Sequence, residues 1–177
     1  MSAAAPAPGF YGKMPAAGDF VTRRLPRSFV QPFDRWMSAG LSRCSPDAAD
    51  GAAWRFTLPA GALGPDPVVG VWRLSPDRAG RVFALVIASP GCTGKPGEDW
   101  YERLADLADE AAEGALEPAR LEALLEALPP VAATPGAAEA TFWCDTLAPF
   151  AVAPDRMADA LTAMLDPFQH LERDPAR

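Results

Sequence analysis

A continuous apolar run at residues 82–88 constrains the fold of this chain more than any other feature. A strand built from it has no polar face to turn toward water, so both faces of its sheet must be covered. Two further apolar runs, at residues 53–58 and 68–74, precede it and are separated by clusters of Gly, Pro and Asp that are typical of turns. We therefore expect an antiparallel meander whose third strand, residues 81–89, lies at the sheet centre between two layers of helices.

Helices are predicted where apolar residues recur at three-and-four spacing. The expected helices are residues 28–43, 98–113, 118–128 and 155–165, and additional strands are expected around Phe10 and at residues 140–144. Pro32 is tolerable only in a first turn, so the first helix is expected to start near Val30. Asp155 is expected to cap the start of the last helix.

The resulting order is β-α-β-β-β-α-α-β-α. It predicts an α/β fold, a three-layer α-β-α sandwich around a mixed, largely antiparallel sheet. We expect a single domain at residues 9–166, with residues 1–8 and 167–177 as flexible tails.

The composition of the 177 residues argues against several classes of protein. Three cysteines lie far apart without a Cys-x-x-Cys pair, which disfavours a disulfide framework and a zinc site and fits a reducing cytoplasm. No apolar run reaches 18 residues, so no membrane insertion is expected. His170 is the only histidine, which disfavours a histidine-based triad.

The charge is divided along the chain. Residues 1–97 carry 11 Lys and Arg against 6 Asp and Glu, whereas residues 98–177 carry 5 against 17. Either the acidic helices form solvated faces, or the surface is bipolar and a basic face steers an acidic or phosphorylated protein. The arginines of that second interpretation are Arg23, Arg24, Arg27, Arg78 and Arg81. Nucleic acid is not an expected partner of so acidic a chain.

Residues 91–97, Gly-Cys-Thr-Gly-Lys-Pro-Gly, do not form a phosphate-binding loop, because Ser89 stands where the first glycine is needed and Pro96 where Ser or Thr is needed. Isolated aspartates beside cations or aromatics do not suggest a metal site. We therefore expect no cofactor, no metal, no small-molecule substrate and no enzymatic activity.

Two segments are candidates for contact with a protein partner. In the loop at residues 12–25, Phe20 stands beside Arg23 without an apolar period, and aromatic and arginine side chains together are common in binding hot spots. The alternative is that Phe20 simply anchors the loop to the core. Residues 77–81 are either a hairpin turn, held by Asp77 with Gly80 at a positive φ, or a contact surface.

The N-terminal block at residues 9–36 has the pattern Gly-Phe-Tyr-Gly-Lys-x-Pro-x-x-Gly-Asp-Phe-Val, followed by Leu-Pro and an aromatic Asp-x-Trp. In this pattern the chain resembles the TagF (ImpM) family of type VI secretion. Downstream matches are Gly70, Val71, Ser75, Asp77, Arg78, Gly80, Arg81 and Phe83, with Trp54-Arg55-Phe56 between the blocks and Phe142-Trp143 after them. Leu74 and Pro76 depart from the pattern.

The resemblance implies a cytoplasmic accessory protein that represses type VI secretion after translation by binding a forkhead-associated scaffold protein. We expect the partner-binding residues to be Lys13, Asp19, Phe20, Arg23, Asp77, Arg78 and Arg81. Two alternatives stay open: a cryptic hydrolase that uses Asp19 or Asp77, and a structural subunit of the secretion apparatus.

Overall fold

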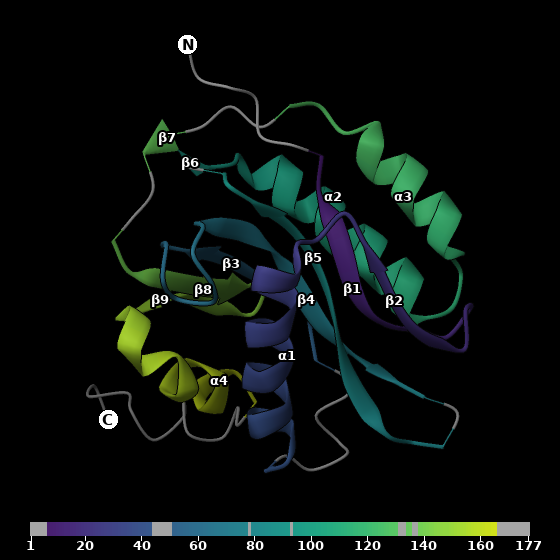
Figure 1. Cartoon of the computed structure of the whole chain (residues 1–177), viewed down its shortest axis with the longest axis horizontal. Helices are drawn as coiled ribbons and strands as arrows, with labels where there is room; N and C mark the ends of the chain where they lie inside the picture. The colour runs from purple at the N-terminus through teal and green to yellow at the C-terminus, as the bar shows by residue number, and fades with distance from the viewer. Residues whose placement is uncertain are drawn as a thin grey trace.

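The computed structural model describes residues 7–43, 51–77, 79–92, 94–130, 134–135 and 138–165. Its centre is a seven-stranded sheet in the order β2-β1-β5-β4-β3-β8-β9, in which all neighbouring strands are antiparallel (Figure 1). The strands are β1 (Gly9–Met14), β2 (Asp19–Arg23), β3 (Trp54–Leu58), β4 (Val68–Pro76), β5 (Val82–Pro90), β8 (Ala140–Cys144) and β9 (Leu147–Val152). Strands β6 (Gly94–Lys95) and β7 (Thr134–Pro135) form a separate two-stranded sheet.

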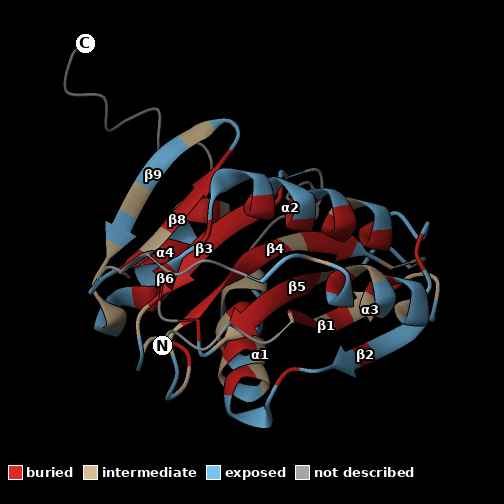
Figure 2. Ribbon diagram, turned by 90° about the horizontal axis from the view of Figure 1, so that it is seen from above, coloured by how far each residue is buried: buried red, intermediate tan, exposed pale blue. Residues whose placement is uncertain are grey.

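Helices cover both faces of the main sheet, as the apolar run at residues 82–88 predicts. They are α1 (Arg27–Leu41), α2 (Glu98–Ala112), α3 (Pro118–Glu126) and α4 (Met157–Leu165), with the 3-10 turn η2 (Pro154–Arg156) before the last. Figure 2 shows α2 above the sheet and α1 below it, with the buried surfaces turned toward the strands. The predicted α-β-α sandwich is confirmed.

The two faces of β5 contribute to two separate hydrophobic clusters. Ala84, Val86 and Ala88 pack in the cluster that contains α1 and α4. Leu85 and Ile87 pack in the cluster beneath α2 and α3. Because alternate residues of a strand point to opposite faces, β5 is a shared wall of the two cores. The predicted meander of β3, β4 and β5 is also confirmed by their pairing.

Several strands were not predicted. Residues 19–23 are not part of a loop but form β2, which pairs with β1 through a four-residue connection. The stretch Phe20-Val21-Thr22 has high β propensity, but so short a strand leaves too few alternations to recognise. Strand β9 was missed for a similar reason, since Pro149 interrupts it.

Val30 and Asp155 are wrong as the predicted first residues of the first and last helices. Helix α1 begins at Arg27, so Pro32 lies inside it. Burial of Phe29, Phe33 and Met37 against the sheet stabilises the helix despite the backbone hydrogen bond that a proline removes. At the end of the chain, Asp155 lies within η2, and no side-chain cap is found there.

Gly12 allows β1 to lie close against β5. Its φ is +147°, and a Cβ built there would lie 2.4 Å from the carbonyl oxygen of Ala84. A side chain at this position would therefore meet backbone, which cannot move aside cheaply. The approach fixes β1, and with it the β2 hairpin, at one margin of the sheet.

Candidate functional site

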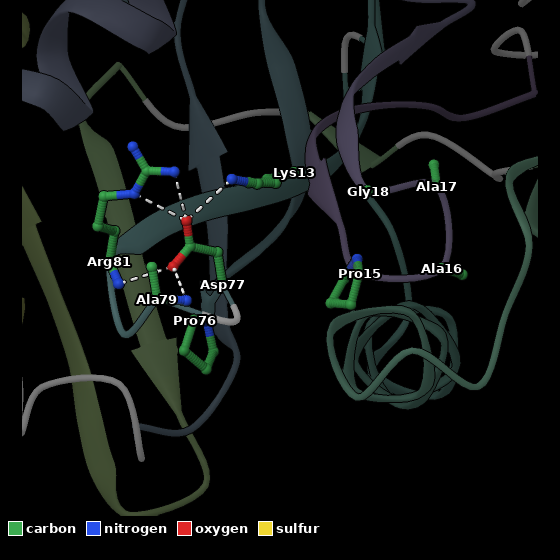
Figure 3. Close-up of a pocket in the computed structure, with 9 residues that line it drawn as sticks. All are labelled: Lys13, Pro15, Ala16, Ala17, Gly18, Pro76, Asp77, Ala79 and Arg81. Carbon is green, nitrogen blue, oxygen red and sulfur yellow. Dashed lines mark hydrogen bonds and ion pairs between the residues drawn. The ribbon is translucent and has the colours of Figure 1, made fainter.

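Asp77 is held by two cations at the end of β4. Its Oδ2 accepts from Lys13 Nζ at 3.0 Å and from Arg81 Nε and Nη2, each at 2.8 Å (Figure 3). The Asp77 side chain is only 7% exposed, whereas that of Arg81 is 69% exposed. We call Lys13, Asp77 and Arg81 the Asp77 cluster.

The same carboxylate organises the turn between β4 and β5. Asp77 Oδ1 accepts from the backbone N–H of Ala79 at 2.9 Å and of Arg81 at 2.8 Å. Gly80 has a φ of +77° and donates its N–H to the Asp77 carbonyl at 3.0 Å. The predicted hairpin turn, with its side-chain to backbone bonds, is therefore present.

These contacts set the charge state of Asp77. Burial raises the pKa of its carboxyl, but the hydrogen bonds from Lys13 and from the Arg81 and Ala79 groups outweigh burial and lower the pKa well below its ordinary value. Asp77 is consequently ionised at neutral pH. Since Lys13 and Arg81 are both cationic, the cluster keeps one net positive charge.

Aromatic side chains lie directly beside the cluster. Lys13 Nζ is 4.6 Å from the ring centroid of Phe83, and the rings of Phe83 and Phe20 make a T-shaped contact with their centroids 5.2 Å apart. Phe20 in turn stacks on Tyr11 at 5.9 Å. Phe20 is 43% exposed, and within the described residues no other large apolar side chain is so open to solvent.

Two hollows flank these aromatics. The larger, about 490 Å³, lies between the Asp77 cluster and the loop from Pro15 to Gly18, as Figure 3 shows. The smaller, about 300 Å³, is lined by residues that include Tyr11, Phe20 and Asp34. There the Tyr11 hydroxyl donates to Asp34 Oδ1 at 2.7 Å, and burial together with this carboxylate raises the Tyr11 pKa.

The structure brings together Lys13, Phe20, Asp77 and Arg81 of the predicted site residues. The other two described residues lie at the two ends of β2. Asp19 accepts the Phe20 N–H at 2.7 Å, and Arg23 lies 3.6 Å from Glu122 of α3. Arg78 lies outside the described residues.

The basic and acidic halves of the chain meet in ion pairs. Arg24 pairs with Glu122 and Glu126 of α3, and Arg73 pairs with Asp109 of α2 at 2.5 Å. The arginines of the first half are thus partly neutralised by the helices of the second half. Of the predicted basic face, Arg27 is exposed and forms no ion pair within the described residues, whereas the exposed Arg81 guanidinium pairs with Asp77.

Sequence reasoning missed Tyr11 and Phe83 as site residues. Tyr11 lies two positions before Lys13 on β1, so the two side chains share a face of the strand. That alternation is a usable signal once β1 is known to extend to Met14. Phe83 matches the family pattern, but it also lies in the apolar run at residues 82–88, which indicates a buried strand residue more than a site residue.

A second polar cluster surrounds Arg55 on β3 and was also missed. Arg55 is 4% exposed, and its Nη1 lies 2.7 Å from Asp145 Oδ1 while its Nε lies 3.4 Å from Glu98 Oε1. Trp143 Nε1 donates to the same Glu98 oxygen at 3.0 Å. With two carboxylates for one guanidinium, this cluster is explained as a structural ion pair.

Comparison with known proteins identifies the family. A family model described as the TagF N-terminal domain, type VI secretion system-associated, matches residues 9–128. The chain belongs to the TagF family. It is therefore a type VI secretion-associated protein, and the Asp77 cluster and Phe20 both lie inside the matched TagF region.

The chain is also similar to a solved structure. The crystal structure of PA0076 from Pseudomonas aeruginosa PAO1 is 30% identical, with a TM-score of 0.62, over 90% of this chain and 78% of that chain. None of the curated proteins matches this TagF chain. Within the described residues, no helix combines the length and apolar character needed to cross a bilayer.

Proposed function

We propose that this TagF protein acts in the cytoplasm as a post-translational negative regulator of type VI secretion, by binding a forkhead-associated scaffold protein. Family membership supports the link to secretion. The proposed contact surface consists of the Asp77 cluster and Phe20, which belong to β1, β2 and the turn between β4 and β5. In this proposal the protein acts by occupying a surface of its partner, without covalent chemistry.

The observation that carries this proposal is that the exposed Phe20 ring and the exposed Arg81 guanidinium both lie against Phe83. The Phe20 centroid is 5.2 Å and the Arg81 guanidinium carbon 5.8 Å from the Phe83 ring centroid. An aromatic ring that stays 43% open to water loses little by moving onto a partner and gains apolar contact there. Arginine presents a fork of donors that suits carboxylate and phosphate groups. This combination is typical of the few residues that dominate binding energy.

The state of the aspartates favours binding over hydrolysis. Every close contact of Asp77 stabilises its ionised form, so it is a weak base at neutral pH, and its oxygens are already occupied by two cations and two N–H groups. General bases work best with a pKa near the operating pH. Asp19 is bound to the N–H of the next residue. Neither carboxylate has the environment that a hydrolase would need.

Retention of the purified scaffold protein on the immobilised chain tests this function. Phe20→Ala and Arg81→Ala should each weaken binding by about tenfold or more, as expected for hot-spot residues. Arg156→Ala is the matched control, because Arg156 is an equally exposed arginine, 69%, which also pairs with an aspartate but lies in η2. Its binding should equal that of the parent.

Unchanged retention in both site variants, with thermal melts equal to those of the parent, would reject the surface. Failure of the parent itself to retain the scaffold protein would reject the proposed partner. The two variants therefore test the contact surface only if the parent chain retains the scaffold protein.

A further inference from the structure

Strand β2 leaves one long side open. It is the last strand of the sheet, with β1 as its only neighbour among the described strands, and Figure 2 shows its exposed residues at the margin. Val21 points into the core beneath α2 and α3, while the other four residues of β2 are exposed. An open edge of this kind offers unpaired backbone groups to another strand.

Two of these backbone groups are occupied by charged side chains of β2 itself. Asp19 Oδ1 accepts the N–H of Phe20 at 2.7 Å, and Arg23 Nη1 donates to the carbonyl of Thr22 at 3.0 Å. In an antiparallel ladder the residues of a strand alternate between its two sides in their backbone hydrogen bonds. Phe20 and Thr22 therefore both face the open edge, away from β1.

The sequence of β2 is complementary to itself when two copies run antiparallel. If Val21 faces Val21 of a second copy, Phe20 faces Thr22, and Asp19 faces Arg23, on both sides of the centre. Phe20 and Thr22 are the outward residues, so their N–H and C=O groups would pair directly. The groups now held by Asp19 and Arg23 are among those that the second strand would satisfy.

Side chains agree with the same register. Asp19 and Arg23 on opposite copies would form two ion pairs in directly facing positions, where opposite charges stabilise a sheet. The two Phe20 rings would lie diagonally across the two-fold axis, within the reach of aromatic side chains. This arrangement would cover the large apolar ring that the isolated chain exposes.

We propose that two copies of this chain associate through β2, antiparallel about Val21, and join their sheets into one. Asp19 and Arg23 act in both states: each holds a backbone group of its own strand in the single chain, and each pairs with the other copy in the dimer. The interface is a short strand pair, so association is reversible and depends on concentration. This inference does not rest on the proposed scaffold binding.

Sedimentation equilibrium of the purified chain, from low to high micromolar concentration, tests the proposal. The parent should rise from the monomer mass toward twice that mass. Thr22→Pro removes an outward N–H and should remain monomeric, while Thr22→Ala keeps that N–H and should dimerise like the parent. A parent that stays monomeric throughout would overturn the proposal.

Charge exchange provides a second test that does not depend on a proline. Asp19→Arg places arginines opposite one another, and Arg23→Asp does the same with aspartates, so each should weaken dimerisation by about tenfold or more. The double variant restores opposite charges and should recover the parent's dimerisation. Equal effects of single and double variants would reject the register.

The proposed scaffold binding can fail independently of this dimer. Arg81→Ala, which should weaken scaffold binding, lies outside β2 and should leave the sedimentation of the chain unchanged. A loss of dimer mass in Arg81→Ala would contradict the placement of the interface at β2.

Discussion

The two margins of the sheet are protected in different ways. At the β2 margin, contacts between charged or polar groups dominate: Asp19 and Arg23 cover the strand's own backbone, and Lys13 binds Asp77. At the β9 margin, aromatic contacts and a proline dominate. The comparison shows that the β2 edge is protected by side chains that can move away from it. The β9 edge is protected by a proline in its own backbone and by aromatic rings packed in the core.

The β9 margin is held by packed aromatic rings, two pairs of them stacked and one edge-to-face. Phe150 of β9 lies 5.7 Å from Phe142 of β8 and 6.2 Å from Trp54 of β3, and Phe142 lies 6.1 Å from Trp36 of α1. Pro149 lies where the register of β8 and β9 shifts. A proline at such a place removes a backbone donor and disfavours another strand.

Salt and pH should therefore act on the two margins unequally. Ion pairs at an exposed margin weaken as salt rises, whereas stacked rings do not depend on charge. The β2 margin is the place where a change in solution conditions can expose backbone groups. It is also the margin to which we assign both the scaffold contact and the second copy.

Gly12→Ala should break the β2 margin and have the largest effect on stability. The new Cβ would meet the Ala84 carbonyl oxygen at 2.4 Å with φ at +147°, so strand β1 must shift away from β5. Backbone strain and the clash together should cost about 3 kcal/mol or more in the free energy of unfolding. Denaturant unfolding measures this loss.

Gly18→Ala is the matched control for that substitution. Gly18 also has a positive φ, +72°, but apart from its two chain neighbours no atom of the described residues lies within 4 Å of a Cβ built there. Only the backbone cost of about 1 kcal/mol is expected. Similar losses in the two variants would show that the close approach of β1 and β5 is not the limiting feature.

Asp77→Asn, which removes a charge next to the β2 margin, should make the stability of the protein less sensitive to acid. Asparagine keeps an acceptor for the N–H groups of Ala79 and Arg81 but loses the charge that Lys13 and Arg81 bind. Because the folded pKa of Asp77 is lowered, its stabilisation is present above the ordinary carboxyl pKa of about 4 and is lost as pH falls below it.

Thermal melts across this pH range test the expectation for Asp77. The parent should melt at a higher temperature than Asp77→Asn at neutral pH, and the gap should narrow as the pH falls below about 4. Asp159→Asn is the control, because Asp159 pairs with Arg156 at the exposed surface of α4. A gap for Asp77→Asn that does not change with pH would contradict the charge assignment.

The layers of the fold follow from periodicity, whereas the margins do not. Residues 82–88 require cover on both faces, and the helices beneath and above the sheet repeat apolar residues at helical spacing, so both were predictable. Strands β2 and β9 are short and half-exposed, so their alternation is too brief to separate from a loop. Their pairing is decided by contacts with β1 and β8.

The candidate site was predictable in part for the same reason. Lys13, Phe20, Asp77 and Arg81 were chosen from residue type and family pattern, but their convergence depends on β1 lying beside β5, which Gly12 permits. Arg23 was chosen for a basic surface and instead contacts its own backbone and α3. Local sequence cannot reveal which charges a distant helix will neutralise.

Pro149→Val should change stability least and test the comparison from the β9 side. Valine supplies the missing N–H and has high β propensity, so β9 becomes a better template for another strand while its stacked Phe150 remains. The free energy of unfolding should change by no more than about 1 kcal/mol, but association should increase. Ala151→Val adds apolar bulk without a new N–H and should not increase association.

Because the added contact would use β9, association should persist when Thr22→Pro is combined with Pro149→Val. If the combined variant is monomeric, proline is not what closes this margin, and the aromatic stack alone separates the two edges.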